Sequence, residues 1–146
     1  MFEHKKMLFD ELNTETIGGG RHYMTPKGAY PSITTVLSVL SKKGIAEWRA
    51  RVGEVEANRI STQAARRGTN VHQMCEDYVN NELDKTKFLP HEKAMFYSIK
   101  KVLDESLGLV YAQECPLYSD YLGIAGRVDC VAEYNGKLSI IDYKTS

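Results

Sequence analysis

A tight turn near the C-terminal end most constrains the fold of this chain. Asn135-Gly136 lies between two runs rich in β-branched and apolar residues, Ile124–Tyr134 and Lys137–Lys144. Asn-Gly is the strongest short-range signal for a two-residue type I′ turn, in which both residues take positive φ angles. The sequence therefore predicts a β-hairpin. Because a two-residue turn fixes which residues face each other, the sequence also predicts the register.

The predicted register places two aspartates, Asp129 and Asp142, opposite each other. Side chains alternate along a strand, so the opposed pair Arg127 and Lys144 points to the same face. Opposed Cβ atoms lie about 4.5–5.5 Å apart, where two carboxylates repel each other. A divalent cation between them would turn this repulsion into attraction, and carboxylate oxygens suit Mg²⁺ or Mn²⁺. The alternative is a solvated face on which acidic side chains keep an edge strand soluble.

Length and composition fit one globular domain. The 146 residues suffice for a hydrophobic core, and 42% hydrophobic and 26% charged residues are ordinary values. No run approaches the roughly 20 apolar residues of a membrane helix, so no membrane partner is expected. The three cysteines lack CxxC spacing, which indicates reduced intracellular thiols rather than a disulfide framework or a zinc site. A net charge of zero counts against a general nucleic-acid coat protein.

The first third of the chain predicts an N-terminal arm with a small hairpin, followed by helices. Ser32 is a suitable N-cap for a helix whose apolar stripe is Val36, Leu37, Val39 and Leu40. A second short helix carries Trp48, which is expected in the core, with base stacking as the alternative. Before Ser32, the sequence predicts a short helix or loose arm at Met1–Thr16, a flexible break at Ile17–Gly20 and a hairpin around Pro26-Lys27. The second short helix, which carries Trp48, covers Ile45–Val52.

Two further helices are predicted to meet at a corner formed by Arg66-Arg67-Gly68-Thr69. Gly68 is suited to end the helix Glu54–Arg67, and Thr69 is suited to cap the helix Asn70–Glu82. The second of these has a core stripe at helical spacing, Val71, Met74, Cys75, Tyr78 and Val79. His72 and Glu76 lie on the flank of that stripe, where a histidine is commonly an ordinary boundary residue.

Basic residues gather between Lys42 and Arg67, where seven lysines and arginines accompany three acids (counted from the sequence). Such a run is either a solvated helix face or a surface for phosphate groups. Tyr118, Tyr121 and Tyr143 are candidates for stacking on unpaired bases, with simple packing at the rim as the alternative.

The second half predicts one more helix and a three-stranded antiparallel meander. Pro90 opens a helix over His91–Leu107, with Met95, Phe96, Ile99, Val102 and Leu103 as its buried face, and Gly108 ends it. The strand Leu109–Leu117 follows and leads into the hairpin, so that helices pack against one face of the meander. Glu114 lies inside this apolar strand, where an unpaired buried carboxylate would cost free energy. A place at the rim of the strand explains Glu114 equally well.

Three segments in this order resemble the RecB-like nucleases of the PD-(D/E)XK superfamily. They are Arg67-Gly68-Thr69-Asn70-Val71-His72 with Glu76, then Gly126-Arg127-Val128-Asp129, and finally Asp142-Tyr143-Lys144-Thr145-Ser146. Within that superfamily the likeness is to the group of mitochondrial genome maintenance and phage exonucleases, over roughly residues 28–146. The resemblance implies an α/β fold of the α+β kind with a restriction-endonuclease-like core. We therefore expect an arm and hairpin at 1–27 and a nuclease domain at 28–146.

The resemblance also implies roles for individual residues. Mg²⁺ or Mn²⁺ would be held by His72, Asp129, Asp142 and the backbone carbonyl of Tyr143, with Glu114 as a further candidate ligand. Lys144 would act with Asp129 and Asp142 in catalysis, by orienting or deprotonating the attacking water or by stabilising the phosphate. The residues expected to contact nucleic acid are Arg66, Arg67, Thr69 and Arg127, with Glu76 in a supporting role.

The expected function is that of a metal-dependent DNA exonuclease on single-stranded or free DNA ends, in replication, recombination or repair of phage or organellar DNA. Its expected location is the cytoplasm of a bacterial or phage-infected cell, or an organellar matrix, with a replication or helicase partner left open. RecB-like nucleases continue beyond the lysine motif, so this domain is expected to be incomplete at its C-terminus. The alternatives are a catalytically inert nucleic-acid-binding module on the same scaffold and a hydrolase of small phosphate esters.

Overall fold

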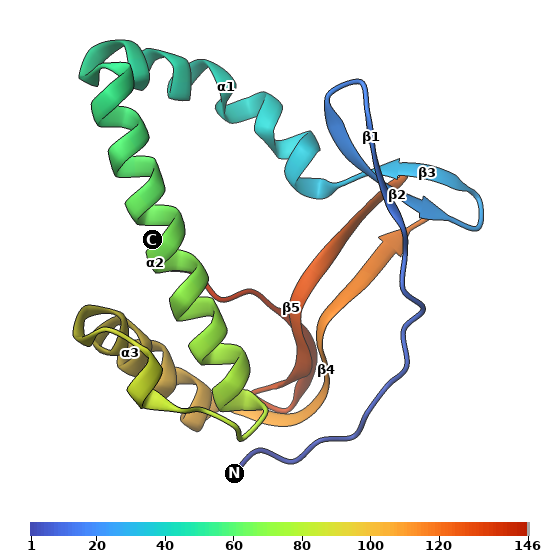
Figure 1. The fold of residues 1–146 in the computed structure, drawn as a ribbon. Helices are drawn as coiled ribbons and strands as arrows, with labels where there is room; N and C mark the ends of the chain where they lie inside the picture. Colours follow the sequence, from blue (N-terminus) through green and yellow to red (C-terminus); the bar gives the residue numbers. More distant parts are fainter. Residues whose placement is uncertain (146) are drawn as a thin grey trace. The chain divides into compact units, whose positions relative to one another are not determined.

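The computed structural model describes residues 1–145 and combines helices with two small β-sheets (Figure 1). One sheet has the strand order β1-β2-β3 and the other the order β4-β5-β6. This mixed composition agrees with the predicted α+β class, and the restriction-endonuclease-like core stays a prediction. The elements are β1 (Thr14–Ile17), β2 (Gly20–Thr25), β3 (Gly28–Pro31), α1 (Ile33–Val52), α2 (Glu54–Val79), η1 (Lys85–Lys87), α3 (Pro90–Ser106), β4 (Leu107–Ser119), β5 (Ile124–Tyr134) and β6 (Lys137–Ile141).

The chain divides into two compact units. The first unit consists of Met1–Leu8, Ile60–Glu114 and Val128–Ser146, and the second of Phe9–Arg59 and Cys115–Arg127. Ser146, the last residue of the predicted lysine motif, lies outside the described residues. The predicted domains at 1–27 and 28–146 stay a prediction. None of the helices in the described part of the chain combines the length and apolarity needed to cross a bilayer.

The first unit contains the hydrophobic core. The apolar stripe predicted on α2 is confirmed, because Val71, Met74, Cys75 and Val79 are fully buried and Tyr78 is partly buried against them. The face predicted on α3 is confirmed at Phe96 and Leu103 and is wrong at Val102, which is exposed. The members contributed by the other elements of this unit are Val110, Cys130, Ala132 and Tyr143. Helix α2 therefore holds its second half against the strands by burying one complete stripe.

The predicted corner at Arg66-Arg67-Gly68-Thr69 is wrong. Helix α2 runs without interruption from Glu54 to Val79 (Figure 1), so Gly68 lies inside it and Thr69 caps nothing. A glycine inside a helix costs only about 0.5–1 kcal/mol relative to alanine. Burial of several apolar side chains is worth considerably more, so the glycine does not stop the helix. The helix ends at Val79, three residues before the predicted Glu82.

The second unit contains the sheet β1-β2-β3 and helix α1. Ser32 caps α1 as predicted, since its Oγ accepts a hydrogen bond from the Thr35 amide at 3.1 Å. One helix replaces the two that were predicted, and Trp48, expected in the core, is only half-buried. The predicted apolar stripe is also wrong, because Val36, Leu37, Val39 and Leu40 are all exposed.

The helix alternative for the N-terminal segment is wrong, because residues 1–13 are irregular apart from an isolated bridge at His4 and only the end of the segment joins a strand. Residues 14–17 form β1, and the glycine-rich segment after it is the turn between β1 and β2 rather than a break. Gly18 and Gly19 adopt positive φ angles there. In the first unit, the Lys5 amide donates to the Val110 carbonyl at 2.8 Å, and the Val110 amide donates to the Glu3 carbonyl at 2.9 Å. The start of the chain is thus held against β4.

The predicted C-terminal hairpin and its register are confirmed. Strands β5 and β6 are antiparallel, with Val131 opposite Ile140 and Cys130 opposite Ile141. Asn135 and Gly136 take φ angles of 49° and 79°, as a type I′ turn requires. Strand β6 ends at Ile141 rather than at Lys144, so the segment Asp142–Lys144 continues beyond the last paired residues.

Strand β4 begins earlier than predicted and contains an irregularity. It starts at Leu107, so Gly108 belongs to the strand and does not end α3. Glu114 has a φ angle of 50°, which is uncommon for a residue other than glycine. Such backbone departures in the middle of a strand redirect the side chains around them and cluster at functional sites.

Candidate metal site

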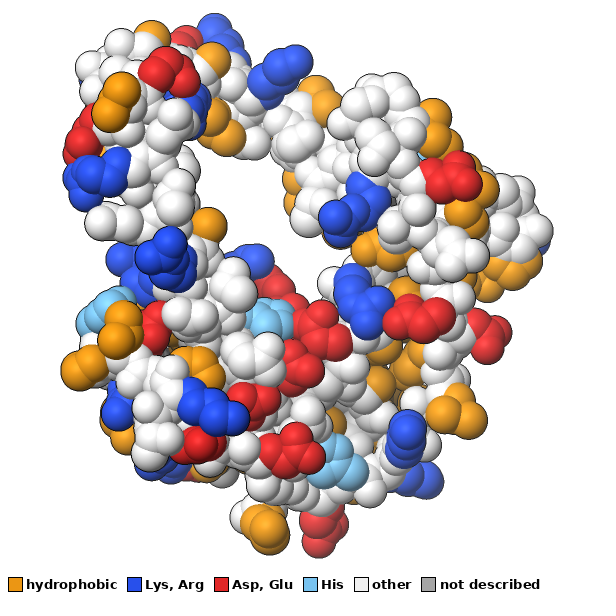
Figure 2. Space-filling view, viewed as in Figure 1, with side chains coloured by type: hydrophobic (Ala, Val, Ile, Leu, Met, Phe, Trp, Pro, Cys, Tyr) orange, Lys and Arg blue, Asp and Glu red, His pale blue; other side chains and the backbone are white. Residues whose placement is uncertain are grey.

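Acidic and basic side chains from four segments converge in the first unit. His72 and Glu76 come from α2, four residues apart on one helix face, and Glu114 comes from β4. Asp129 comes from β5, and Asp142 follows the end of β6. On the face shown in Figure 2, acidic side chains gather beside a histidine, and lysine and arginine side chains lie over α2.

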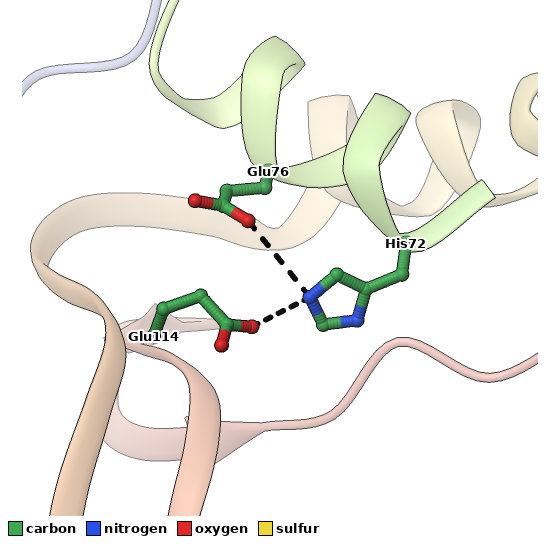
Figure 3. Close-up of side chains that lie close together, drawn as sticks. All are labelled: His72, Glu76 and Glu114. Atoms are coloured by element: carbon green, nitrogen blue, oxygen red, sulfur yellow. Dashed lines mark hydrogen bonds and ion pairs between the residues drawn. The ribbon is translucent and has the colours of Figure 1, made fainter. Parts of the chain in front are cut away.

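The His72 ring lies at the centre of this cluster. Its Nε2 atom lies 2.5 Å from Oε1 of Glu114 and 3.9 Å from Oε2 of Glu76 (Figure 3). Its Nδ1 atom lies 3.5 Å from Oδ1 of Asp129. A carboxylate oxygen accepts hydrogen bonds, so the Nε2–H group of His72 donates to Oε1 of Glu114. The ring therefore presents one nitrogen to the two glutamates and the other to the aspartate.

Asp129 and Asp142 form the pair that the hairpin register predicted. They lie one step beyond the last paired residues and share a side-chain hydrogen bond. The pKa of Asp129 is raised to about 6, first by burial and then by the hydrogen bond with Asp142. Burial acts in the same direction on Asp142, but hydrogen bonds from Asp129 and Lys144 outweigh it and hold the pKa of Asp142 below its usual value. Below about pH 6, Asp129 therefore keeps its proton beside an ionised Asp142, and above that pH both carboxyl groups are charged.

Lys144 reaches the same pair from the exposed side. Its Nζ lies 2.7 Å from Oδ2 of Asp142, and its side chain is largely exposed. The hydrogen bond to Asp142 raises the pKa of Lys144, so the ammonium form is favoured. The Tyr143 amide donates to Oδ2 of Asp129 at 2.8 Å and fixes the orientation of that carboxyl group.

An open pocket of about 490 Å³ adjoins the cluster. His72, Glu76 and Glu114 line one part of it, and its remaining lining residues are Gly68, Thr69, Gln73, Tyr143, Lys144 and Thr145. The pocket gives a ligand from solution access to the imidazole and to both glutamates.

The donor set fits a divalent cation. The ligating atoms of His72, Glu76 and Glu114 all lie within 4.8 Å of one another. Asp129 adds a carboxylate on the other side of the ring. One imidazole nitrogen among several carboxylate oxygens suits Mn²⁺ or Mg²⁺, whereas the soft thiolates that select zinc or copper are not part of the cluster. A cation on the glutamate side would use Nε2 of His72, and one on the Asp129 side would use Nδ1.

The structure brings together every side chain predicted for the metal and for catalysis, namely His72, Glu114, Asp129, Asp142 and Lys144. It also adds Glu76, which the sequence had assigned a supporting role at nucleic acid. The spacing of four residues between His72 and Glu76 was the signal for this, since residues four apart share one helix face.

The residues predicted for nucleic acid are distributed differently. Arg66 and Thr69 are exposed, and Thr69 lines the pocket. The Nε atom of Arg67 is buried and makes no hydrogen bond within residues 1–145. Arg127 belongs to the second unit, where its guanidinium lies 3.2 Å from the Glu11 carboxylate.

Two features of the site escaped the sequence analysis. Tyr143, considered for base stacking, is buried, and its hydroxyl donates to Oε1 of Gln113 at 2.9 Å. Nothing in the sequence points to Gln113, because a lone glutamine in a strand gives no signal of its own. Tyr118 and Tyr121 are exposed and stay candidates for stacking.

Comparison with known proteins finds similarity to exonucleases. No family model matches the chain. It is 29% identical over 129 residues to mitochondrial genome maintenance exonuclease 1 of Mus musculus and 28% identical over 133 residues to that of Homo sapiens, in both cases over 82% of this chain. It is 32% identical over 136 residues, or 86% of this chain, to the same protein of Xenopus tropicalis. The chain spans 38% of the length of each of these relatives. These similarities support a relationship to a nuclease family.

Proposed function

We propose that this chain carries the metal site of a DNA exonuclease of the RecB-like PD-(D/E)XK kind. The observation that supports the proposal most strongly is the convergence of one imidazole and four carboxylates from separate segments, with Asp129 and Asp142 in hydrogen-bond contact. Repulsion among these carboxylates is a cost that a divalent cation removes. The similarity to proteins named exonucleases supports the same reaction class.

His72, Glu76, Glu114, Asp129 and Asp142, with the backbone carbonyl of Tyr143, would hold one or two Mg²⁺ or Mn²⁺ ions. The bound metal supplies an activated water and neutralises charge on the scissile phosphate. Lys144, whose raised pKa keeps it cationic at neutral pH, stabilises negative charge on that phosphate. Asp142 holds the Lys144 ammonium beside the carboxylate pair, at 2.7 Å.

The substrate in this proposal is DNA with free, single-stranded ends. Thr69 lines the pocket, and Arg66 lies exposed three residues before it on α2, so the proposal assigns both to the phosphates of an entering strand. The open form of the pocket suits a flexible strand better than a small phosphate ester, which enclosed pockets bind. The function would serve maintenance of phage or organellar DNA.

The proposal is tested by incubating the full chain with end-labelled linear single-stranded and duplex DNA, and with internally labelled circular single-stranded DNA, in Mn²⁺, in Mg²⁺ and in EDTA. We expect cleavage of linear single strands only with metal, and we expect circles to resist. Asp142→Asn should reduce the rate by at least about 100-fold, as loss of an electrostatic group at a reacting phosphate does. Asp104→Asn, which removes a carboxylate that pairs with Lys100 on α3, serves as the matched control and should retain activity.

Two outcomes would contradict the proposal. Cleavage that persists in EDTA, or that is unchanged in Asp142→Asn, would remove the metal site from the reaction. Binding of single-stranded DNA without any cleavage in either metal would identify the chain as an inert module that retains only the scaffold.

A further inference from the structure

Gln113 links helix α2 to the segment that follows β6. Its Nε2 donates to the backbone carbonyl of Glu76 at 3.1 Å, and its Oε1 accepts from the hydroxyl of Tyr143 at 2.9 Å. One amide thus joins an element that carries His72 and Glu76 to the segment that carries Asp142 and Lys144.

The backbone of β4 makes this link possible beside Glu114. Successive side chains of a regular strand point to opposite faces. Here Gln113 reaches the Glu76 carbonyl on α2, and its neighbour Glu114 reaches His72 on the same helix. The positive φ angle of Glu114 breaks the alternation and lets two consecutive side chains serve one site.

Tyr143 connects Gln113 to two of the proposed metal ligands, Asp129 and His72. Its amide donates to Oδ2 of Asp129, and its ring meets the His72 ring edge to face with 5.7 Å between centroids. Strand β6 has already ended at Ile141, so the strand ladder no longer fixes this segment. The orientation of Tyr143 therefore depends on its buried contacts, among which the hydroxyl bond to Gln113 is directional.

We infer that Gln113 is a positioning residue for the metal site, and that it acts through the hydroxyl of Tyr143. The inference rests on the proposed function and goes beyond it, because Gln113 offers no ligand and contacts no substrate. The Tyr143 hydroxyl is the donor of the bond to Gln113. A carbonyl oxygen only accepts, so the Gln113 amide has a single orientation in which both of its bonds are satisfied.

The test compares Gln113→Met, Tyr143→Phe and the double variant in the full chain. Calorimetric titration with Mn²⁺ measures metal affinity, and thermal unfolding in EDTA measures the stability of the metal-free protein. Groups that orient metal ligands typically contribute 10- to 100-fold to affinity, so each single variant should bind Mn²⁺ about 10-fold more weakly. If the two residues act through one bond, the double variant should bind no more weakly than the single variants, within about twofold.

Tyr111→Phe is the matched control. Tyr111 lies in β4 as Gln113 does, and its hydroxyl donates to Glu133 at 3.1 Å without contacting the cluster. This variant loses one hydroxyl bond and should keep its Mn²⁺ affinity. A purely structural role for Gln113 would lower the unfolding temperature as much as the control does and leave the Mn²⁺ affinity unchanged, which would overturn the inference.

A second readout separates this inference from the proposed function. If the wild-type chain binds no Mn²⁺, the proposed metal site fails, and the inference fails with it. If the wild type binds Mn²⁺ and both single variants bind it equally well, only the inference fails. In cleavage assays, raising the Mn²⁺ concentration should restore the kcat of Gln113→Met while its KM for DNA stays near that of the wild type.

Discussion

At the scale of single residues, the carboxyl pair Asp129 and Asp142 combines burial with electrostatic repulsion between two acidic groups. The two groups share a hydrogen bond, and the pKa of Asp129 is raised to about 6 while that of Asp142 is lowered. Below about pH 6, one proton on Asp129 therefore reduces the repulsion within the pair in the metal-free protein. Metal binding therefore releases that proton, and metal affinity should increase with pH over the range in which Asp129 ionises.

The same raised pKa predicts how Asp129 affects stability without metal. The folded state holds the proton up to pH about 6, and an ordinary aspartate releases it at 3.8. The contribution of this group to stability is therefore fully present below pH about 4 and is lost as the pH rises through about 6. Asp129→Asn cannot ionise, so at pH 7.5 in EDTA it should be more stable than the wild type by about 1 kcal/mol, allowing for partial solvation.

Urea unfolding at pH 5 and pH 7.5 measures this effect. The gain from Asp129→Asn should be smaller at pH 5, because the wild-type carboxyl group is then mostly protonated. Asp104→Asn provides the comparison of opposite sign, since the hydrogen bond from Lys100 lowers the pKa of Asp104 and its loss should destabilise at pH 7.5. Equal stability of Asp129→Asn and the wild type at both pH values would contradict the raised pKa.

At the scale of elements, helix α2 matters most, because it delivers His72 and Glu76 to the site. The sequence suggested a helix end at Gly68, but the helix continues through it. A Cβ atom at Gly68 would lie 3.6 Å from Oγ1 of Thr145, an ordinary contact, and its φ angle is not positive. Gly68→Ala should therefore stabilise the protein by about 0.5–1 kcal/mol, through reduced entropy of the unfolded chain.

Gly53→Ala is the matched control for this prediction. Gly53 ends α1 with a φ angle of 90°, which an L-residue adopts only with strain, although the space around it is open. This substitution should destabilise by about 1 kcal/mol or more. Chemical denaturation of both variants tests the continuity of α2. If Gly68→Ala were as destabilising as Gly53→Ala, Gly68 would be a helix terminus as the sequence first suggested.

At the scale of the whole molecule, the first unit is assembled from segments that are far apart in the chain. The Phe2 amide donates to Oδ1 of Asn81, 79 residues away, at 2.9 Å. The Phe2 ring packs edge to face on Tyr78 with 5.2 Å between centroids, next to the core. The first residues are thus part of the unit that carries the proposed metal site.

Phe2→Ala should lower the free energy of unfolding by about 1–2 kcal/mol, because the ring is partly buried and pairs with another aromatic ring. Leu8→Ala is the control, since Leu8 is 88% exposed and its truncation should change stability by less than about 0.5 kcal/mol. Thermal or urea unfolding measures the free energy of unfolding of the two variants. Similar stabilities would show that the N-terminal segment does not contribute to the unit.

The sequence by itself determined the features that depend on local geometry. The dipeptide Asn135-Gly136 predicts the positive φ angles that the turn adopts. The length of this turn then determines the register that pairs Asp129 with Asp142. The helical spacing of apolar residues likewise predicted which face of α2 is buried. Backbone sterics and side-chain periodicity act over a few residues, so they can be read from neighbouring letters.

Only the tertiary structure decided which distant groups meet. Gly68 carried a local signal for a helix end, and burial of the stripe on α2 outweighed it. The contact of His72 with Glu114, 42 residues away, depends on how β4 packs and on an irregular backbone angle within it. Gln113 acquires its role only because Glu76 and Tyr143 lie on either side of it. Such contacts arise from packing free energy summed over the whole unit, which no short stretch of sequence expresses.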